Sequence, residues 1–308
     1  MSMVDSEAPL CLPRLPLTRL PAYPLPQGTI DTHFHVFRSG APLNTPRSYT
    51  PDIATTADWI TFADRLGVGR GILVQPSVYG LDNQVLIEAL TAFPDRLRGI
   101  VVIDPETVPE EIARLDRLGV RGVRINTRNK GGLPLAAAET LAAAIRDFGW
   151  SLQLQISPDQ ISDLAGRLPQ LGARFVIDHL GFIPLADGAW REHVPALQRL
   201  ADSPGGYIKL TAPYRLTSEC GYVGFAEVVQ ALAASHPQKL LWGSDWPHTE
   251  LWSNMPDDAD LIDGMQEAIG TPELTRRIFI DNAETLFFGR GHGDRPIGGR
   301  ADRERLPK

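Results

Sequence analysis

Two histidines separated by one residue, His33 and His35, are the first side chains in the sequence that could carry out chemistry. They belong to the run Asp-Thr-His-Phe-His that begins at Asp31. Side chains two residues apart in a β-strand point to the same face. We therefore expect Asp31, His33 and His35 to share one face, with the two imidazoles converging on a site. A structural pair of hydrogen-bonded histidines is the alternative, because short motifs also occur by chance.

In two later segments, titratable residues follow directly after an apolar run. Asp178 and His179 follow one run, and we expect His179 to face the site while strand alternation turns Asp178 away, to anchor neighbouring backbone. Asp245 follows another run between Trp242 and Trp246, whose apolar rings would raise its basicity and make it a competent general base. A buried structural histidine and a loop-capping aspartate are the alternatives.

Four residues could form one centre if the fold brings their segments together: His33, His35, His179 and Asp245. Such a set could hold one divalent metal, such as zinc, which would generate hydroxide and polarise a carbonyl group. It could equally work without a metal, with the histidines donating to a carbonyl oxygen while Asp245 deprotonates water. Gln153 and Gln155 stand where a richer site would have another histidine, which argues against a binuclear centre. We favour the arrangement that requires no cofactor.

Several basic residues follow the fourth and seventh apolar runs. Arg124 and Arg215 suit bidentate recognition of a carboxylate, which predicts an organic acid as substrate. Arg128 and Lys130 either extend this site or form a solvated charge cluster.

Short apolar runs alternate with amphipathic helical windows along the chain, the pattern of βαβ units that build a parallel sheet. Almost every run ends in a polar residue, and barrel enzymes place their active sites at the carboxyl ends of the strands. We therefore predict a single-domain α/β fold, the (β/α)8 or TIM barrel. Its expected strands are Thr29 to Phe34, Gly71 to Gln75, Arg98 to Ile103, Gly122 to Ile125, Ser151 to Gln155, Arg174 to Ile177, Tyr207 to Leu210 and Leu240 to Gly243.

Composition narrows the class of protein. The 308 residues carry a net charge of -7 and no cluster of Lys or Arg, which argues against a nucleic-acid partner. No stretch approaches the ~20 apolar residues of a membrane span, and two cysteines cannot build a disulfide framework, so we expect a cytoplasmic protein. We divide the chain into a proline-rich arm (1–27), the barrel (28–288) and a flexible tail (289–308). The oligomeric state is left open.

The sequence resembles the amidohydrolase family that includes the 2-pyrone-4,6-dicarboxylate lactonases. The resemblance rests on ordered blocks at 31–37, 47–51, 119–124, 178–181 and 242–248. It implies a barrel that hydrolyses lactones of carboxylic acids in aromatic catabolism, with Asp245 as the base and the three histidines holding the carbonyl group. It also implies a substrate-binding set: Tyr49, Ser77, Arg124, Lys130, Gln155, Arg215 and His248.

Two positions depart from the pattern that the resemblance implies. Gln155 replaces an aromatic hydroxyl, and Phe182 replaces an arginine, so the substrate is expected to carry one carboxylate fewer or to be a sugar-acid or muconolactone-type lactone. Three other functions remain open at this point. They are a mononuclear zinc-dependent hydrolase or decarboxylase, a sugar-lactone isomerase, and a barrel that binds carboxylates without catalysis.

Overall fold

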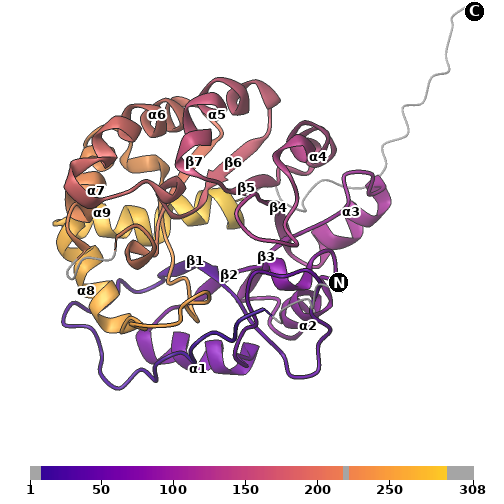
Figure 1. Ribbon diagram of the computed structural model, residues 1–308, viewed down its shortest axis with the longest axis horizontal. Coiled ribbons are helices and arrows are strands. Elements are labelled where there is room, and N and C mark those ends of the chain that lie inside the picture. Colours follow the sequence, from indigo (N-terminus) through magenta and orange to yellow (C-terminus); the bar gives the residue numbers. More distant parts are fainter. Residues whose placement is uncertain (1–7, 218–221, 290–308) are drawn as a thin grey trace, which may run out of the picture.

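Eight parallel strands form the centre of the protein in a computed structural model that describes residues 8–217 and 222–289 (Figure 1). Neighbouring strands follow the order of the chain, so each strand pairs with the next. Every strand lies within two residues of its predicted bounds, which confirms the predicted barrel. The strands are β1 (Ile30–Phe34), β2 (Arg70–Val74), β3 (Leu97–Val101), β4 (Val120–Asn126), β5 (Ser151–Gln155), β6 (Arg174–Ile177), β7 (Gly206–Leu210) and β8 (Leu240–Trp242).

The barrel closes where the segment after β8 meets the end of β1. The Asp245 amide donates to the His33 carbonyl at 2.8 Å, and the His35 amide donates to the Trp246 carbonyl at 2.8 Å. Gly243 permits this approach, because a β-carbon there would lie 2.7 Å from the backbone nitrogen of His33. Closure thus brings residues 33–35 and 245, more than 200 positions apart in sequence, to one edge of the barrel.

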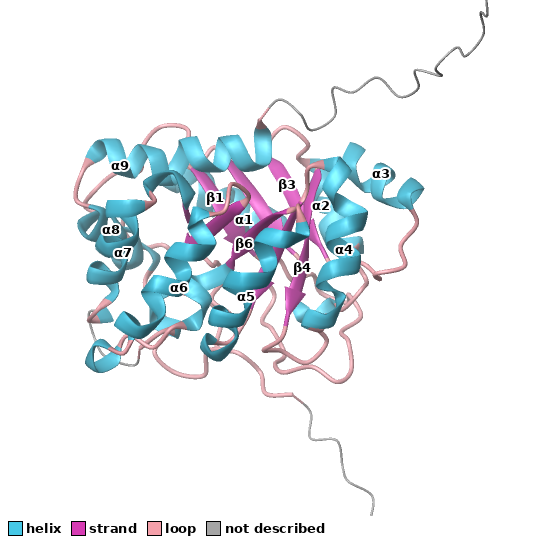
Figure 2. Ribbon diagram, turned by 90° about the horizontal axis from the view of Figure 1, so that it is seen from above, coloured by secondary structure: helices cyan, strands magenta, loops and turns pink. Residues whose placement is uncertain are grey.

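Helices surround the strands (Figure 2). The first of them shows how local sequence sets the bounds: Thr55 and Asp58 form a capping box at its start, and Gly67 adopts a left-handed conformation at its end. The helices are α1 (Thr56–Leu66), α2 (Gln84–Ala92), α3 (Pro109–Arg117), α4 (Ala138–Ile145), α5 (Ile161–Arg167), α6 (Trp190–Asp202), α7 (Phe225–Ser235), α8 (Asp258–Ile269) and α9 (Pro272–Arg276). No described helix is both long enough and apolar enough to cross a membrane.

Two apolar clusters leave the carboxyl ends of the strands to polar residues. One fills the amino-terminal half of the barrel with inward side chains such as Ile30, Ile72 and Val176, against which Phe287 packs. The larger cluster lies between the strands and the surrounding helices. The barrel interior is therefore apolar at its amino-terminal end and polar at its carboxyl-terminal end. The predicted site residues lie at the polar end.

The described part of the predicted arm, residues 8–27, lies extended across loops at the polar end of the barrel. The Cys11 amide donates to the Thr50 carbonyl at 2.8 Å, and the Leu12 amide donates to the Leu251 carbonyl at 2.9 Å. Cys11 is buried, and its thiol accepts a hydrogen bond from the Glu250 amide. The arm thus covers the loop that follows β8. The predicted tail from residue 290 onward lies outside the described residues.

Candidate active site

The end of β1 delivers both histidines of the first motif to the barrel interior, but not Asp31. The pairing of β1 with β2 shifts register between Asp31 and Phe34, which breaks the simple alternation that we predicted. Asp31 accepts hydrogen bonds from the Ser244 hydroxyl at 2.6 Å and from the Trp59 indole at 3.2 Å, and Phe34 stacks on the same indole. The expectation that Asp31 shares a face with the histidines is therefore wrong; it ties β1 to the loop after β8.

Four predicted catalytic residues converge on one point. His33 Nε2 lies 3.2 Å from His35 Nε2 and 3.6 Å from Asp245 Oδ1. His179 Nε2 lies 3.9 Å from the same carboxylate oxygen. All four side chains are at least 96% buried, and Asp245 Oδ1 has no hydrogen-bond partner among the described residues. A buried, unpartnered carboxylate oxygen facing three imidazoles has the geometry of a general base beside hydrogen-bond donors.

His179 reaches this centre because the backbone turns left-handed directly after β6. His179 has φ 49°, and Leu180, Gly181 and Phe182 also have positive φ. Left-handed conformations are costly for residues with a side chain and are concentrated at functional sites. The turn lets both Asp178 and His179 point inward, and the Thr211 hydroxyl holds His179 Nδ1 at 2.7 Å.

A second polar layer lies beneath the imidazoles and contains a residue that we did not predict. Lys209 Nζ, fully buried, lies 2.9 Å from Gln153 Oε1, 3.1 Å from His33 Nδ1 and 3.3 Å from Asp178 Oδ1. The expectation that Asp178 only anchors backbone is therefore wrong. Its carboxylate receives the Gln153 amide at 3.0 Å and lies 3.3 Å from His33 Nδ1.

The electrostatic surroundings of Asp245 differ from the prediction. Burial alone would raise its pKa, but Arg215 foremost, followed by the three imidazoles, holds the pKa of Asp245 well below its usual range. Arg215 Nε donates to Asp245 Oδ2 at 2.8 Å, and the Tyr214 hydroxyl donates to the same oxygen. The expectation that flanking apolar rings raise the basicity of Asp245 is wrong in the free protein, because a guanidinium contacts the carboxylate directly.

The three imidazoles are neutral at physiological pH. Burial lowers the pKa of His35 to about 3 and that of His179 to about 4, and it holds the pKa of His33 well below its usual range. Lys209 adds to the effect on His33, whereas its own pKa falls through burial to about 8. Each imidazole therefore has one N–H donor and one bare nitrogen, a state suited to binding a carbonyl oxygen.

A small inner cavity of about 10 Å³ lies above the centre. Five of the seven predicted substrate-binding residues line it: Tyr49, Ser77, Arg124, Gln155 and Arg215. Arg124 donates to the Gln75 carbonyl at 3.1 Å and to the Gln155 amide oxygen, while its buried Nε has no partner among the described residues. Arg124 thus has one N–H group that could donate to a substrate. Its partner Gln155 occupies the position where the resemblance implied an aromatic hydroxyl.

The remaining two predicted substrate-binding residues lie elsewhere. His248 is fully buried, with Nδ1 3.0 Å from the Tyr214 hydroxyl and Nε2 3.0 Å from Asp258, so both of its nitrogens are occupied behind the site. Lys130 is exposed on the loop after β4, where its backbone amide donates to Ser48. Neither residue lines the inner cavity, because the loops carry His248 behind Tyr214 and Lys130 outward.

An outer cavity of about 260 Å³ adjoins the inner one and shares Asn129, Arg215 and Glu250 with it. The Arg128 guanidinium lies 3.8 Å above the centre of the Phe182 ring in its wall. Phe182, which replaces an arginine expected from the resemblance, thus positions another arginine. Arg128 thus supplies positive charge at the mouth of the site.

The site contains residues that carried no recognisable sequence motif. Glu250 and Asn129 line both cavities, and the Asn129 amide donates to the Glu250 carboxylate. A loop carboxylate or amide is common in any sequence, so nothing marks these two residues in advance. Lys209 did carry a signal, a lone cation at an inward position of an otherwise apolar strand.

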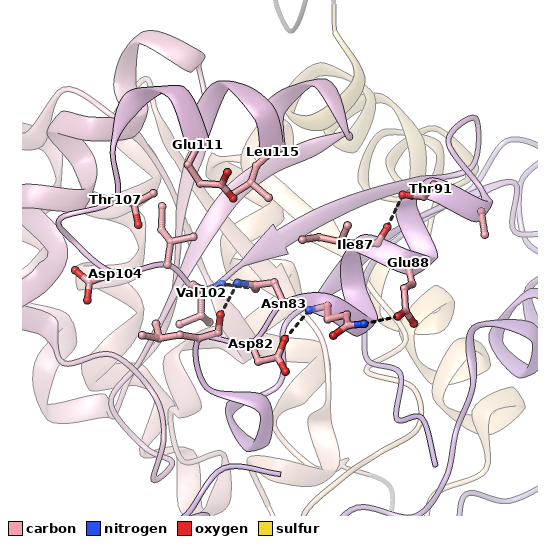
Figure 3. Close-up of a pocket in the computed structure, with 14 residues that line it drawn as sticks. Asp82, Asn83, Ile87, Glu88, Thr91, Val102, Asp104, Thr107, Glu111 and Leu115 are labelled. Carbon is pink, nitrogen blue, oxygen red and sulfur yellow. Dashed lines mark hydrogen bonds between the residues drawn. The ribbon is translucent and has the colours of Figure 1, made fainter. Parts of the chain in front are cut away.

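A cavity of about 740 Å³, larger than either site cavity, lies outside the barrel between α2 and α3 (Figure 3). Its wall combines apolar side chains such as Ile87 and Leu115 with the carboxylates of Glu88 and Glu111. None of its lining residues is His, Lys or Arg, so it offers no cationic partner for an anionic substrate. The cavities at the carboxyl ends of the strands remain the candidate active site.

The centre also offers ligand atoms for a metal ion. His33, His35 and Asp245 offer ligand atoms 3.2 and 3.6 Å apart, spacings that suit tetrahedral ligands about 2.0–2.2 Å from zinc. The unpartnered Asp245 Oδ1 also fits this use. A second possible group, His33 with Asp178 and His179, has the Lys209 ammonium in contact with two of its members. The first group fits a single metal ion. In the second group, the ammonium group of Lys209 already supplies the positive charge.

Comparison with known proteins adds independent evidence. The family model described as amidohydrolase matches residues 30–289. The chain is 32% identical over 274 residues to 4-sulfomuconolactone hydrolase of Rhizobium radiobacter, covering 86% of this chain and 92% of that one. It is 28% identical over 282 residues to 2-pyrone-4,6-dicarboxylate hydrolase of Comamonas testosteroni, covering 87% and 92%.

A solved structure shows the same architecture. A protein of Pseudomonas putida, provisionally named a 2-pyrone-4,6-dicarboxylic acid hydrolase, superposes with a TM-score of 0.77 and 31% identity. The match covers 86% of this chain and 98% of that chain. The family model, which matches residues 30–289, spans all the segments that build the centre.

Proposed function

The chain belongs to the amidohydrolase family, and we propose that it is an enzyme that hydrolyses the ring ester of small anionic lactones. One observation carries the proposal: the buried, unpartnered Oδ1 of Asp245 faces three neutral imidazoles at the carboxyl ends of the strands. This arrangement provides a base for water and donors for a carbonyl oxygen, the two requirements of ester hydrolysis. Relatives named as lactone hydrolases support the same reaction.

In the proposed mechanism, the lactone carbonyl lies among the imidazoles above Asp245. Asp245 Oδ1 takes a proton from water, and the water oxygen forms a bond to the carbonyl carbon. His33 and His179 donate from Nε2 to the oxyanion that develops, which is where preorganised donors contribute most. The bond to the ring oxygen then breaks, and the proton held by Asp245 passes to that oxygen. The product is a ring-opened acid.

Arg124 and Arg215 support an anionic substrate. Both residues line the inner cavity, and the buried Nε of Arg124 has no hydrogen-bond partner among the described residues. A guanidinium suits bidentate binding of a carboxylate. Arg128 adds positive charge at the outer cavity, which fits a second anionic group on the lactone.

We also propose that no metal is required. His33, His35 and Asp245 would hold zinc if it were bound, and the ion would supply polarisation of the carbonyl group and a bound water of lowered pKa. The metal-free reaction is supported by the donors and base that the chain already provides, and by the contact of Lys209 with His33. Activity that persists after dialysis against a chelator is expected, and activity that returns only with zinc would favour the metal-dependent alternative.

The substitution Asp245→Asn tests the proposed base. The assay follows acid release from 2-pyrone-4,6-dicarboxylate, 4-sulfomuconolactone and an uncharged δ-lactone. Loss of a general base lowers kcat by about 10²–10⁴-fold. Asp163→Asn, on an exposed face of α5, is the matched control and should retain full activity.

Three results would count against the proposal. Undiminished turnover by the Asp245→Asn variant would remove Asp245 as the base. Conversion of one lactone into an isomeric lactone without acid release would identify an isomerase. Tight binding of intact lactone by the unmodified protein without any product would identify a binding barrel.

A further inference from the structure

A line of four polar groups crosses the barrel beneath the substrate cavity. Lys209 Nζ lies 3.1 Å from His33 Nδ1, and His33 Nε2 lies 3.2 Å from His35 Nε2. His35 Nδ1 lies 2.7 Å from the backbone carbonyl of Val74. The donors and acceptors at the two ends of this line determine where the protons lie in the middle.

The carbonyl end sets the state of His35. A backbone carbonyl can only accept a hydrogen bond, so His35 Nδ1 carries a proton and donates it to Val74. In a neutral imidazole the other nitrogen, Nε2, is then bare. His35 Nε2 is thus an acceptor, and His33 Nε2 lies 3.2 Å from it.

The cation end sets the state of His33. An ammonium group has three N–H donors and no acceptor. Three groups surround Lys209 Nζ: Gln153 Oε1 at 2.9 Å, Asp178 Oδ1 as an ion-pair partner at 3.3 Å, and His33 Nδ1 at 3.1 Å. The third accepts only if His33 Nδ1 is bare, and the proton of neutral His33 then resides on Nε2. Hydrogen bonds therefore run in one direction, from Lys209 through His33 and His35 to Val74.

We propose that Lys209 is a positioning residue that fixes His33 as the Nε2–H tautomer and thereby disfavours metal binding by His33, His35 and Asp245. A metal ion needs the bare nitrogen of His33, whereas a lactone carbonyl needs the Nε2–H, which it would share with His35 Nε2. Lys209 thus selects the donor state that the proposed hydrolysis uses, and in this respect the inference rests on the proposed function. Its role is exerted through His33, because Lys209 lines neither of the two site cavities.

Asp178 competes with Lys209 for the same nitrogen. Its Oδ1 lies 3.3 Å from His33 Nδ1, and in the absence of the ammonium it would accept a proton from that atom. His33 would then be the Nδ1–H tautomer with a bare Nε2 toward His35 and Asp245. Replacing Lys209 by an uncharged side chain of similar length should therefore convert a carbonyl-binding centre into a metal-binding one.

The test uses the ring ¹⁵N chemical shifts of histidine-labelled protein, with His33→Gln identifying the His33 signals. The unmodified protein should show the Nε2–H tautomer of His33, and Lys209→Met should show the Nδ1–H tautomer. The Lys209→Met variant should also bind zinc about 10–100-fold more tightly, the usual scale for changes behind a metal ligand. Lys239→Met is the matched control, because it removes the same charge from the other end of the barrel and should change neither reading.

The unmodified protein alone can overturn the inference. An Nδ1–H tautomer of His33 in that protein would refute it, even if the Lys209→Met variant did not fold. In a folded variant, unchanged zinc affinity and an unchanged tautomer would also refute it. Neither reading uses a substrate, so a failure of the proposed lactone hydrolysis is distinguished from a failure of the role of Lys209.

Discussion

The substitution Tyr214→Phe tests how the protein sets the basicity of Asp245. The Tyr214 hydroxyl donates to Asp245 Oδ2, beside the contact from Arg215. Tyr214 is not among the described residues that line the inner or the outer cavity, so the change leaves the lining of the substrate site in place. Only the hydroxyl is removed, which deletes one donor to the carboxylate together with the contact to His248 Nδ1.

The size and sign of the effect follow from that hydrogen bond. A hydrogen bond to a charged group contributes about 1.5–3 kcal/mol. Because one pKa unit corresponds to about 1.4 kcal/mol, loss of the bond should raise the pKa of Asp245 by about 1–2 units. The base acts as a carboxylate, so activity falls as the pH drops through this pKa. A raised pKa moves the acidic limb of the profile to higher pH.

The measurement is kcat/KM for an anionic lactone as a function of pH. The acidic limb of the Tyr214→Phe variant should lie about 1–2 pH units above that of the unmodified protein. Tyr207→Phe, at the start of β7, provides the matched control and should leave the limb in place. An acidic limb that is unchanged or moves to lower pH in the Tyr214→Phe variant would refute the assignment of Asp245 as the titrating base.

Two further substitutions test recognition of the substrate. Arg124→Met should raise KM for anionic lactones by the equivalent of about 2–5 kcal/mol, because truncating one partner of a buried charged pair usually costs this much. The effect on KM for an uncharged lactone should be far smaller. A uniform loss for both classes of lactone would show a structural role instead. Phe182→Ala removes the ring beneath Arg128 and should raise KM by about 2–30-fold, for a cation–π contact of about 0.5–2 kcal/mol. An unchanged KM would argue against this role.

The barrel was predictable because its signals are local and repeated. Strand β6 is an apolar run that ends before Asp178, and β5 alternates leucine with serine and glutamine. The structure reproduces the predicted bounds of both strands. The fold brings together His33, His35, His179 and Asp245 as the order of the strands implied. Periodicity and chain order suffice for this level of description.

The contacts within the site were less predictable, because they depend on departures from regular strands. The register shift in β1 separates Asp31 from the histidines, and the left-handed turn that begins at His179 brings this imidazole inward beside Asp178. Neither departure has a periodic signature. The reversal of the expected pKa shift of Asp245 has the same origin, since Arg215 approaches from a loop whose path the sequence pattern does not define.

The low pKa of Asp245 opposes its role as a base, because a stabilised carboxylate removes a proton from water poorly. The conflict is resolved if the substrate competes for Arg215. Arg215 lines both site cavities while it donates to Asp245, so an anionic group entering there can attract the guanidinium away from the carboxylate. Binding energy would then raise the basicity of Asp245 only in the complex. An uncharged lactone, which cannot attract Arg215, should therefore have a lower kcat as well as a higher KM than an anionic lactone. If only KM differs for the uncharged δ-lactone, Arg215 does not control the basicity of Asp245 in this way.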